Sequence, residues 1–143
     1  MTRNPDFEIE EVRGLDAAWP ALESLLRDSH EYYLPIIGFG PPEDWVAEMQ
    51  ERFRPGEDAL VLIASCSGRP VAFANAVVRR SRGTPPHRHV YLDNVYVLEA
   101  FRGQGIGHAM FSLVESWAKS KGIDQIRLEV LAGNYLAFDF WNR

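Results

Sequence analysis

Residues 101–107 read Phe-Arg-Gly-Gln-Gly-Ile-Gly, and this stretch decides the fold of the chain. A strand-like segment precedes it, and the apolar residues behind it recur with the period of one helix face. These residues are Ile106, Ala109, Met110, Leu113, Val114, Trp117 and Ala118. The three glycines stand at alternate positions, where they let the main chain turn tightly and approach a ligand closely. We therefore predict a strand, a glycine loop and a helix in direct succession.

The start of this helix is a candidate anion site. The first N–H groups of a helix have no partner within the helix, and they point toward whatever lies at its end. An ordinary strand-to-helix turn is the alternative, but three alternating glycines behind Arg102 favour a phosphate ligand. The spacing excludes a P-loop, because His108 and Ala109 follow Gly107 where that motif has lysine and a hydroxyl residue. A dinucleotide fingerprint fails as well, since its third glycine would fall on His108 or Met110.

Residues 102–107 do match the pattern Arg-x-x-Gly-x-Gly, which resembles the GNAT superfamily of N-acetyltransferases. The resemblance continues through Leu128-Glu129-Val130 and Asn134-x-x-Ala137-x-x-Phe140-Trp141, and it covers most of the chain. It implies that acetyl-CoA is the cofactor, with its pyrophosphate on the glycine loop. The cofactor-binding residues that it implies are Arg102, Gly103, Gln104, Gly105, Ile106, Gly107, Asn134 and Trp141. A short local match also resembles polyamine-type acetyltransferases.

Composition sets broad limits on the class of protein. The 143 residues suit a single domain, 1–143, and 46% hydrophobic with 24% charged residues is typical of a globular protein. A net charge of −5 argues against a nucleic-acid partner and weakly favours cationic small substrates. We find neither a signal peptide nor an apolar run of membrane-spanning length, so we expect no membrane partner and a cytoplasmic location.

The first half of the chain predicts strands and helices in alternation. Alternating apolar residues predict an edge strand from Phe7 to Val12, and a following helix is expected to close at residues 30–33. Residues 34–40 are apolar and glycine-rich, which is typical of a loop that lines a pocket. We expect the acceptor to enter there, beside Tyr32, Tyr33 and Phe39. A second helix should carry Trp45, Met49 and Phe53 on one face, and residues 59–66 and 71–78 should form a hairpin.

The next strand, residues 89–98, changes phase in its middle. Val90 and Leu92 are apolar at even positions, whereas Val95 and Val97 are apolar at odd positions. A β-bulge at residues 93–94 would explain the change, because one extra residue rotates the rest of the strand. Burial of both faces is the alternative. A bulge would leave backbone groups free for a ligand, and the GNAT resemblance implies that Val95, Tyr96 and Val97 contact the pantetheine arm.

The remaining segments complete the predicted α/β (α+β, GNAT-like) fold. The glycine-opened helix should end at Lys119, Lys121 and Gly122, and Ile126, Leu128 and Val130 alternate as a further strand parallel to residues 89–98. Asn134 could cap a last helix, which makes about four helices around a mixed, largely antiparallel sheet. Members of the resembled family continue beyond this point with further strands, which are absent here. We therefore expect either a truncated chain or a partner, such as a second copy in a homodimer, over the open sheet edge.

An amine acceptor needs a base, because it arrives mostly as ammonium. Asp93 is the candidate, acting through water, and it occupies the place where similar acetyltransferases of small amines carry glutamate. Binding the substrate cation is its alternative role. The free N–H of Val95 or Tyr96 could stabilise the oxyanion.

Proton donation to the departing thiolate is the second chemical requirement. Family members often place a tyrosine where this chain has Trp141, and an indole is a very poor acid. Tyr135 or Tyr91 could replace it. His87 and His89 form a His-x-His pair without further ligands, so we expect no metal, although His89 is an alternative proton acceptor.

The sequence thus predicts an acetyl-CoA-dependent N-acetyltransferase that acts on a primary amine of a small molecule or peptide by direct attack in a ternary complex. A non-catalytic acyl-CoA-binding or regulatory module is one alternative, which Trp141 would explain. A subunit that folds only with a partner is the other.

Overall fold

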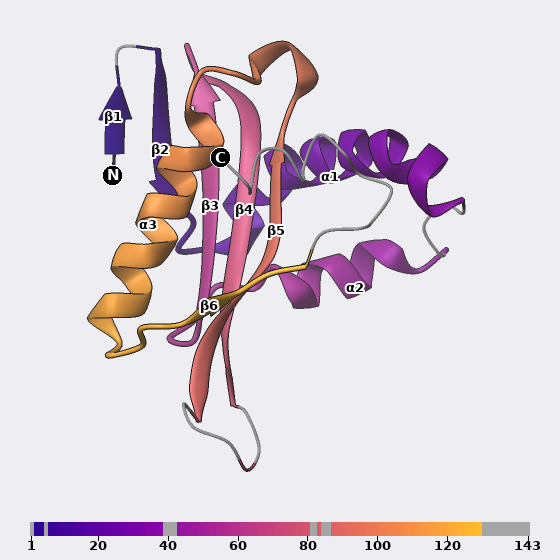
Figure 1. Ribbon diagram of the computed structural model, residues 1–143. Coiled ribbons are helices and arrows are strands. Elements are labelled where there is room, and N and C mark those ends of the chain that lie inside the picture. The colour runs from indigo at the N-terminus through magenta and orange to yellow at the C-terminus, as the bar shows by residue number, and fades with distance from the viewer. Residues whose placement is uncertain (1, 5, 39–42, 81–82, 84–86, 130–143) are drawn as a thin grey trace.

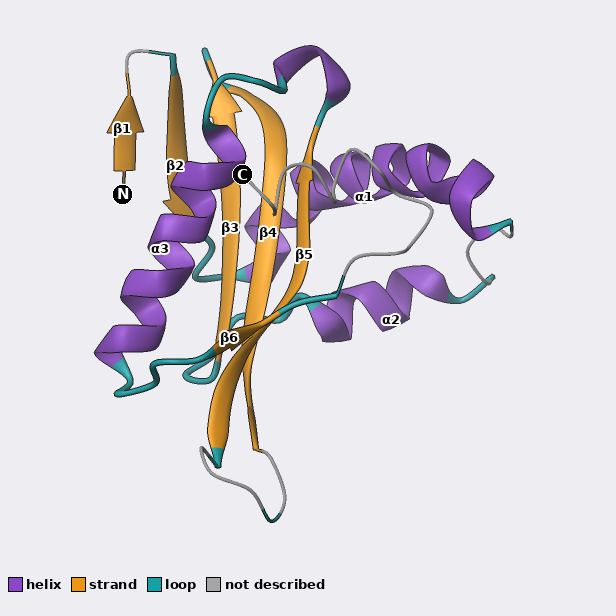
Figure 2. Cartoon of the chain, viewed as in Figure 1, coloured by secondary structure: helices purple, strands orange, loops and turns teal. Residues whose placement is uncertain are grey.

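A computed structural model describes residues 2–4, 6–38, 43–80, 83 and 87–129, and all structural statements below concern these residues. Its strands are β1 (Thr2–Asn4), β2 (Phe7–Glu11), β3 (Ala59–Cys66), β4 (Arg69–Arg80), β5 (Arg88–Val97) and β6 (Ile126–Arg127). Its helices are α1 (Leu15–Ile37), α2 (Trp45–Arg52), the short 3₁₀ helix η1 (Glu99–Phe101) and α3 (Ile106–Ser120). Figure 2 shows these elements by type.

The sheet follows the chain, with strand order β1-β2-β3-β4-β5-β6. Each neighbouring pair is antiparallel except β5 and β6, which are parallel and joined through α3. The predicted mixed sheet with one parallel pair is therefore confirmed. The predicted edge strand is different, because β1 pairs with β2 on its outer side. The short segment before Phe7 carries no alternating pattern that would have revealed β1.

Helices cover both faces of the sheet (Figure 1). On one face α3 contributes Ile106, Met110, Val114 and Ala118 to a core that also contains Val90 and Leu92 of β5. On the other face α1 and α2 pack Leu22, Leu25, Trp45 and Phe53 against Phe73 and Tyr96. The alternation of β4 and β5 side chains between two apolar cores is what holds the helices in two layers.

Helix α1 is longer than its sequence pattern suggests. We expected it to close at residues 30–33 and to leave an apolar loop, but it continues through Pro35 to Ile37. Gly38 ends the helix with φ +88°, and its N–H donates to the carbonyl of Leu34 at 2.8 Å. Pro35 removes a single backbone donor near the helix end, whereas Gly38 supplies the left-handed conformation that terminates a helix. Residues 34–37, which we expected in a loop, are therefore helical, and Tyr32 and Tyr33 lie within α1 and not at its end.

Two turns have the geometry that their sequences predict. Ser67 and Gly68 join β3 to β4 with φ values of 49° and 81°, as a tight two-residue hairpin requires. Gly122 follows α3 with φ 72°. Within the described residues, no helix is at once long and apolar enough to cross a bilayer. The predicted last helix at Asn134 lies outside the described residues, as does Val130.

Candidate functional site

Strand β5 contains the predicted bulge. Asn94 lies opposite Asn75 of β4, and Leu92 lies opposite Ala76. Asp93 is therefore the one residue of β5 that has no pairing partner on β4. Before the bulge, Val90 and Leu92 face the α3 core. Beyond it, Tyr96 faces the α1 and α2 core while Val95 and Val97 pack toward α3. The change of phase in the sequence is therefore a bulge, as predicted.

The bulge also decides which backbone groups of β5 remain outside the pairing with β4. The N–H of Leu98 donates to the carbonyl of Val71 at 2.9 Å, which makes these two residues a hydrogen-bonded pair. Because such pairs alternate along an antiparallel ladder, Tyr96 also points its N–H toward β4, while Val95 and Val97 point theirs away. The pairing with β6 extends over Val90 and Tyr91 only. Within the described residues, the outer edge of β5 at Val95 and Val97 thus has no strand beside it.

The glycine loop leads from this edge into α3. Gly103 and Gly105 have φ values of 81° and 87°, a backbone conformation that residues other than glycine rarely adopt. The first α-helical bond runs from the N–H of Ala109 to the carbonyl of Gly105 at 3.0 Å. The N–H groups of Ile106 and Gly107 therefore precede any intrahelical acceptor, and the helix dipole adds partial positive charge at the same point.

Arg102 connects this loop to β5 and α1. Its Nε donates to the carbonyl of Val97 at 2.9 Å. Its guanidinium carbon lies 4.4 Å from the ring centroid of Tyr32 and 5.5 Å from that of Tyr96. One face of the cation is therefore used for stacking, and the predicted phosphate contact would fall to the remaining Nη groups or to the loop N–H groups.

The tyrosines that we predicted near the acceptor form an aromatic cluster around Tyr96. Tyr32 and Tyr33 lie 5.9 Å and 6.3 Å from its ring, measured between centroids. The hydroxyl of Tyr96 donates to the carboxylate of Asp28 on α1. Burial raises the pKa of Tyr96, and this hydrogen bond and the charge of Asp28 raise it further. Asp28 was missed because it lies one turn before the tyrosines, with no motif around it.

Asp93 lies in a polar group on the face of the sheet that α1 and α2 cover. Asn75, which is only 2% exposed, donates from Nδ2 to Asp93 at 3.4 Å and accepts from the amide of Asn94 at 2.9 Å. The Nε of Arg52 on α2 lies 3.8 Å from the same carboxylate oxygen. The Asn75 amide thus has partners on both sides of the bulge and holds Asp93 in place. Asn94 and Arg52 were not predicted as site residues.

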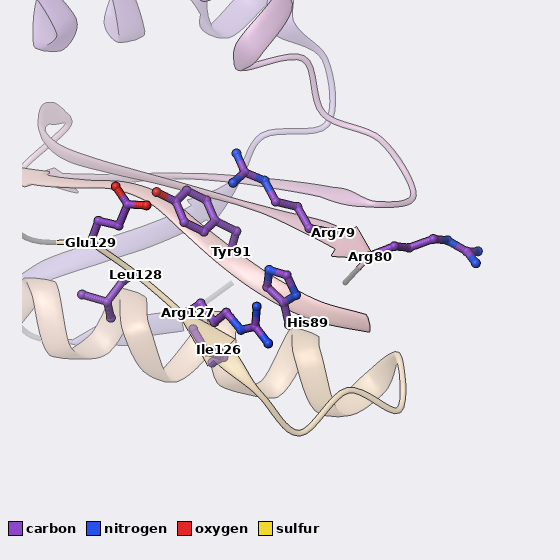
Figure 3. A pocket seen from close by; sticks show the side chains of 8 residues that line it. All are labelled: Arg79, Arg80, His89, Tyr91, Ile126, Arg127, Leu128 and Glu129. Atoms are coloured by element: carbon purple, nitrogen blue, oxygen red, sulfur yellow. The ribbon is translucent and has the colours of Figure 1, made fainter. Parts of the chain in front are cut away.

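A hollow lies along the first half of β5 (Figure 3). Its lining residues come from three neighbouring strands and the segment after β6, and they are Arg79, Arg80, His89, Tyr91, Ile126, Arg127, Leu128 and Glu129. Burial lowers the pKa of His89, and the positive charges of Arg127 and then Arg79 lower it further. A proton acceptor among arginines is a poor base, so the geometry does not favour His89 for that role. Across the described residues no cluster of metal-ligand type occurs.

Four predicted site residues lie outside the described residues: Phe39, Asn134, Tyr135 and Trp141. The structure brings the others together at one end of β5. These are Tyr32, Tyr33, Asp93, Val95, Tyr96, Val97 and residues 102–107. The bulge in the antiparallel β4–β5 pair, the parallel β5–β6 pair and the glycine-opened helix define a class of α/β domains in which a strand edge leads to a helix N-terminus. Such a helix N-terminus is suited to an anionic ligand.

Comparisons with known proteins identify the family within this class. The model of the acetyltransferase (GNAT) family matches residues 19–143. The chain therefore belongs to the acetyltransferase (GNAT) family.

Individual relatives match this chain either over a short stretch or at low sequence identity. The thialysine N-epsilon-acetyltransferase of Bos taurus is 43% identical over 54 residues, which cover 38% of this chain and 32% of that protein. The aminoglycoside N(6′)-acetyltransferase type 1 of Stenotrophomonas maltophilia is 26% identical over 93 residues, or 63% of this chain and 61% of that protein. The matched region thus covers about a third of the first relative and less than two thirds of the second. The aminoglycoside N-acetyltransferase AAC(6′)-Iy in complex with CoA shares the fold with a TM-score of 0.77 at 20% identity, over 99% of this chain and 88% of that one.

Proposed function

We propose that the chain transfers an acetyl group from acetyl-CoA to a primary amine of a small molecule or peptide, by direct attack in a ternary complex. One observation supports this proposal above the others. The bulge at Asp93 turns the backbone of Val95 and Val97 outward directly before a loop that ends in the N-terminus of α3. An extended ligand with an anionic end fits such an edge and loop better than a compact one does.

The described residues fit acetyl-CoA in their chemistry. The N–H groups of residues 103–107 would hold the pyrophosphate, and the outward N–H groups of Val95 and Val97 would pair with the pantetheine arm together with the carbonyl of Val95. The carbonyl of Val97 already accepts from Arg102. Bound CoA in the structurally similar AAC(6′)-Iy supports the same choice of ligand. When bound, acetyl-CoA supplies an activated thioester.

The acceptor must lose a proton during the reaction. One ammonium proton would leave before attack, the nitrogen would then form a bond to the acetyl carbon, and the carbon–sulfur bond would break. A second proton would leave the nitrogen in the same reaction and end on the departing thiolate. At neutral pH, freeing a lysine-like amine costs about 4 to 5 kcal/mol. Asp93 would receive the first proton through water, and Asn75 and Arg52 hold its carboxylate in position.

The carbonyl oxygen gains negative charge in the transition state and needs a fixed donor. We considered the N–H of Val95 and of Tyr96. The ladder geometry favours Val95, because Tyr96 points its N–H toward β4. An acid for the departing thiolate is a smaller requirement. Tyr91 is badly suited, since burial and then the charge of Glu129 raise its pKa, and Glu129 also accepts a hydrogen bond from it.

A melting experiment followed by a thiol-release assay tests the proposal. Acetyl-CoA at about a hundred times its Kd should stabilise the protein by roughly 2.7 kcal/mol, and amines should then release CoA thiol. An unchanged Tm would contradict the cofactor assignment. A raised Tm without thiol release from any amine would instead support the non-catalytic acyl-CoA-binding module. Melting at two protein concentrations tests the predicted homodimer in the same experiment.

A further inference from the structure

The hollow along the first half of β5 has a local charge that an amine substrate alone does not explain. Three arginines line it, Arg79, Arg80 and Arg127, against one carboxylate, Glu129. Among the described residues, none of these arginines forms an ion pair; Arg127 donates to the neutral Gln125 at 3.0 Å. Guanidinium groups without carboxylate partners in a concave surface are suited to an anionic ligand.

Most polar side chains of the hollow lie on the same side of the sheet as Asp93, whereas Ile126 and Leu128 pack toward α3. Figure 3 shows Arg79, His89, Tyr91 and Glu129 on the side opposite α3, while Arg80 extends away from the others. Asp93 lies on that side as well, since it meets Arg52 of α2. The hollow and the candidate base therefore lie on the same side of the sheet, and Tyr91 of the hollow precedes Asp93 by two residues.

Arg79 is positioned to act close to Asp93. Its guanidinium carbon lies 3.8 Å from the ring centroid of Tyr91. The positive charge of Arg79 therefore lies over the Tyr91 ring. Tyr91 precedes Asp93 by two residues, which corresponds to roughly 7 Å along a strand. An anionic group on Arg79 would thus lie about one lysine side chain away from an amine at Asp93.

Glu129 adds a second kind of contact in the same hollow. It accepts a hydrogen bond from the hydroxyl of Tyr91, and Figure 3 shows it beside that ring. A carboxylate near two guanidinium groups can receive an α-ammonium while the arginines receive an α-carboxylate. This pairing matches the head group of a free amino acid.

We propose that the hollow is an acceptor subsite for a zwitterionic head group, and that the preferred acceptor is a free amino acid with a side-chain amine. Arg79 and Arg127 bind its carboxylate, Glu129 binds its α-ammonium, and the side-chain amine reaches Asp93. The proposal rests on the proposed acetyl transfer. Polycationic acceptors should be poor substrates, because their positive charges would meet the arginines without compensation.

Matched acceptors test this subsite. L-lysine and cadaverine offer the same amine chain, but cadaverine lacks the carboxylate. With acetyl-CoA, kcat/KM for lysine should exceed that for cadaverine by about tenfold or more. In an Arg79→Gln, Arg127→Gln double variant, KM for lysine should rise about tenfold to a hundredfold. Cadaverine turnover should rise in the same variant, because the repulsion between its ammonium group and the two guanidinium groups is removed. Arg88→Gln, an exposed change on β5 outside the hollow, is the matched control and should alter neither. A wild-type preference for cadaverine, or an equal loss for both acceptors, would overturn the proposal.

A binding measurement separates the subsite from the chemistry. Calorimetry with Nε-acetyl-L-lysine needs no turnover. Binding to the wild type and Arg88→Gln that is lost in the double variant would support the subsite even if no amine released thiol, in which case only the proposed transfer fails. Equal binding to the double variant, or no binding to any form, would overturn the subsite whatever the activity.

Discussion

Asn75 shows how a single buried residue can organise a site. Its amide is 2% exposed and contacts Asp93 and Asn94, which are adjacent in β5 at the bulge. An uncompensated amide at this depth would cost on the order of 1 to 3 kcal/mol, so the two partners are a requirement of burial as well as of geometry. The sequence alone could not name these partners, because they lie on another strand.

Replacing Asp93 tests the role of the carboxylate that Asn75 holds. Asp93→Asn keeps the shape of the side chain and removes the proton acceptor. We expect kcat to fall on the order of a hundredfold or more, while the Kd for acetyl-CoA stays within about twofold. Thiol-release assays measure kcat, and calorimetry measures the Kd for acetyl-CoA. Asp124→Asn, an exposed carboxylate in the loop after α3, is the control for charge alone, and unchanged kcat in Asp93→Asn would remove Asp93 from this role.

Tyr96 offers a pH-dependent test at the same scale. Its pKa is raised by burial first and by Asp28 second, so the folded state holds the phenol proton more tightly than the unfolded state does. The resulting stability is fully present below the unfolded pKa of about 10 and is lost as the pH rises above it. Tyr96→Phe should lower the free energy of unfolding by about 1.5 to 3 kcal/mol at pH 8.

Denaturant melts of the wild type and Tyr96→Phe at pH 8 and pH 11 measure this effect. The difference between the two proteins should shrink at the higher pH, because only the wild type loses the contribution of this hydroxyl. A difference that grows toward pH 11 would mean that the hydroxyl does not stabilise the folded state as a donor to Asp28.

At the scale of elements, the glycine loop and α3 follow their sequence pattern closely. The helix begins at Ile106 and ends at Ser120, where the apolar period and the flanking glycines place it. Local chemistry determines both ends, because each needs a left-handed glycine. The end of α1 did not follow the pattern, since Pro35 and the apolar run suggested a loop while Gly38 determined the real terminus.

The two glycines that flank α3 form a matched pair of positions. Gly105 has φ 87° and Gly122 has φ 72°, and an added Cβ would meet nothing within 4 Å at either one. Gly105→Ala and Gly122→Ala should therefore each cost about 1 to 2 kcal/mol through backbone strain alone. Only Gly105→Ala should also weaken acetyl-CoA binding, because its Cβ and altered φ act at the anion site.

Thermal melts with and without acetyl-CoA distinguish the two variants. The apo Tm should fall by similar amounts in both, while the ligand-induced rise in Tm should shrink in Gly105→Ala only. Equal ligand responses would show that the loop is an ordinary turn, which was the alternative reading of its three glycines.

For the whole molecule, the layer order could be predicted and the distribution of charge could not. Periodicity in β4, β5 and α3 places helices on both faces of the sheet, because each apolar stripe needs a core. The net charge of −5 favoured cationic substrates, yet Arg79, Arg80 and Arg127 gather in one hollow. These arginines come from segments almost fifty residues apart, and the pairing of β5 with β4 on one side and with β6 on the other brings them together.

The bulge also determines which of two consecutive amides faces the ladder with β4 and which faces outward, and amide hydrogen exchange can observe the difference. Tyr96 points its N–H into the ladder with β4, and Val95 points its N–H outward. Nuclear magnetic resonance should therefore record slow exchange at Tyr96 in every state and, at Val95, exchange that slows when acetyl-CoA is added. The amide of Val95 would then serve as the probe and that of Tyr96 as the reference, and together they would report whether a ligand occupies the edge of β5 without any label or substitution.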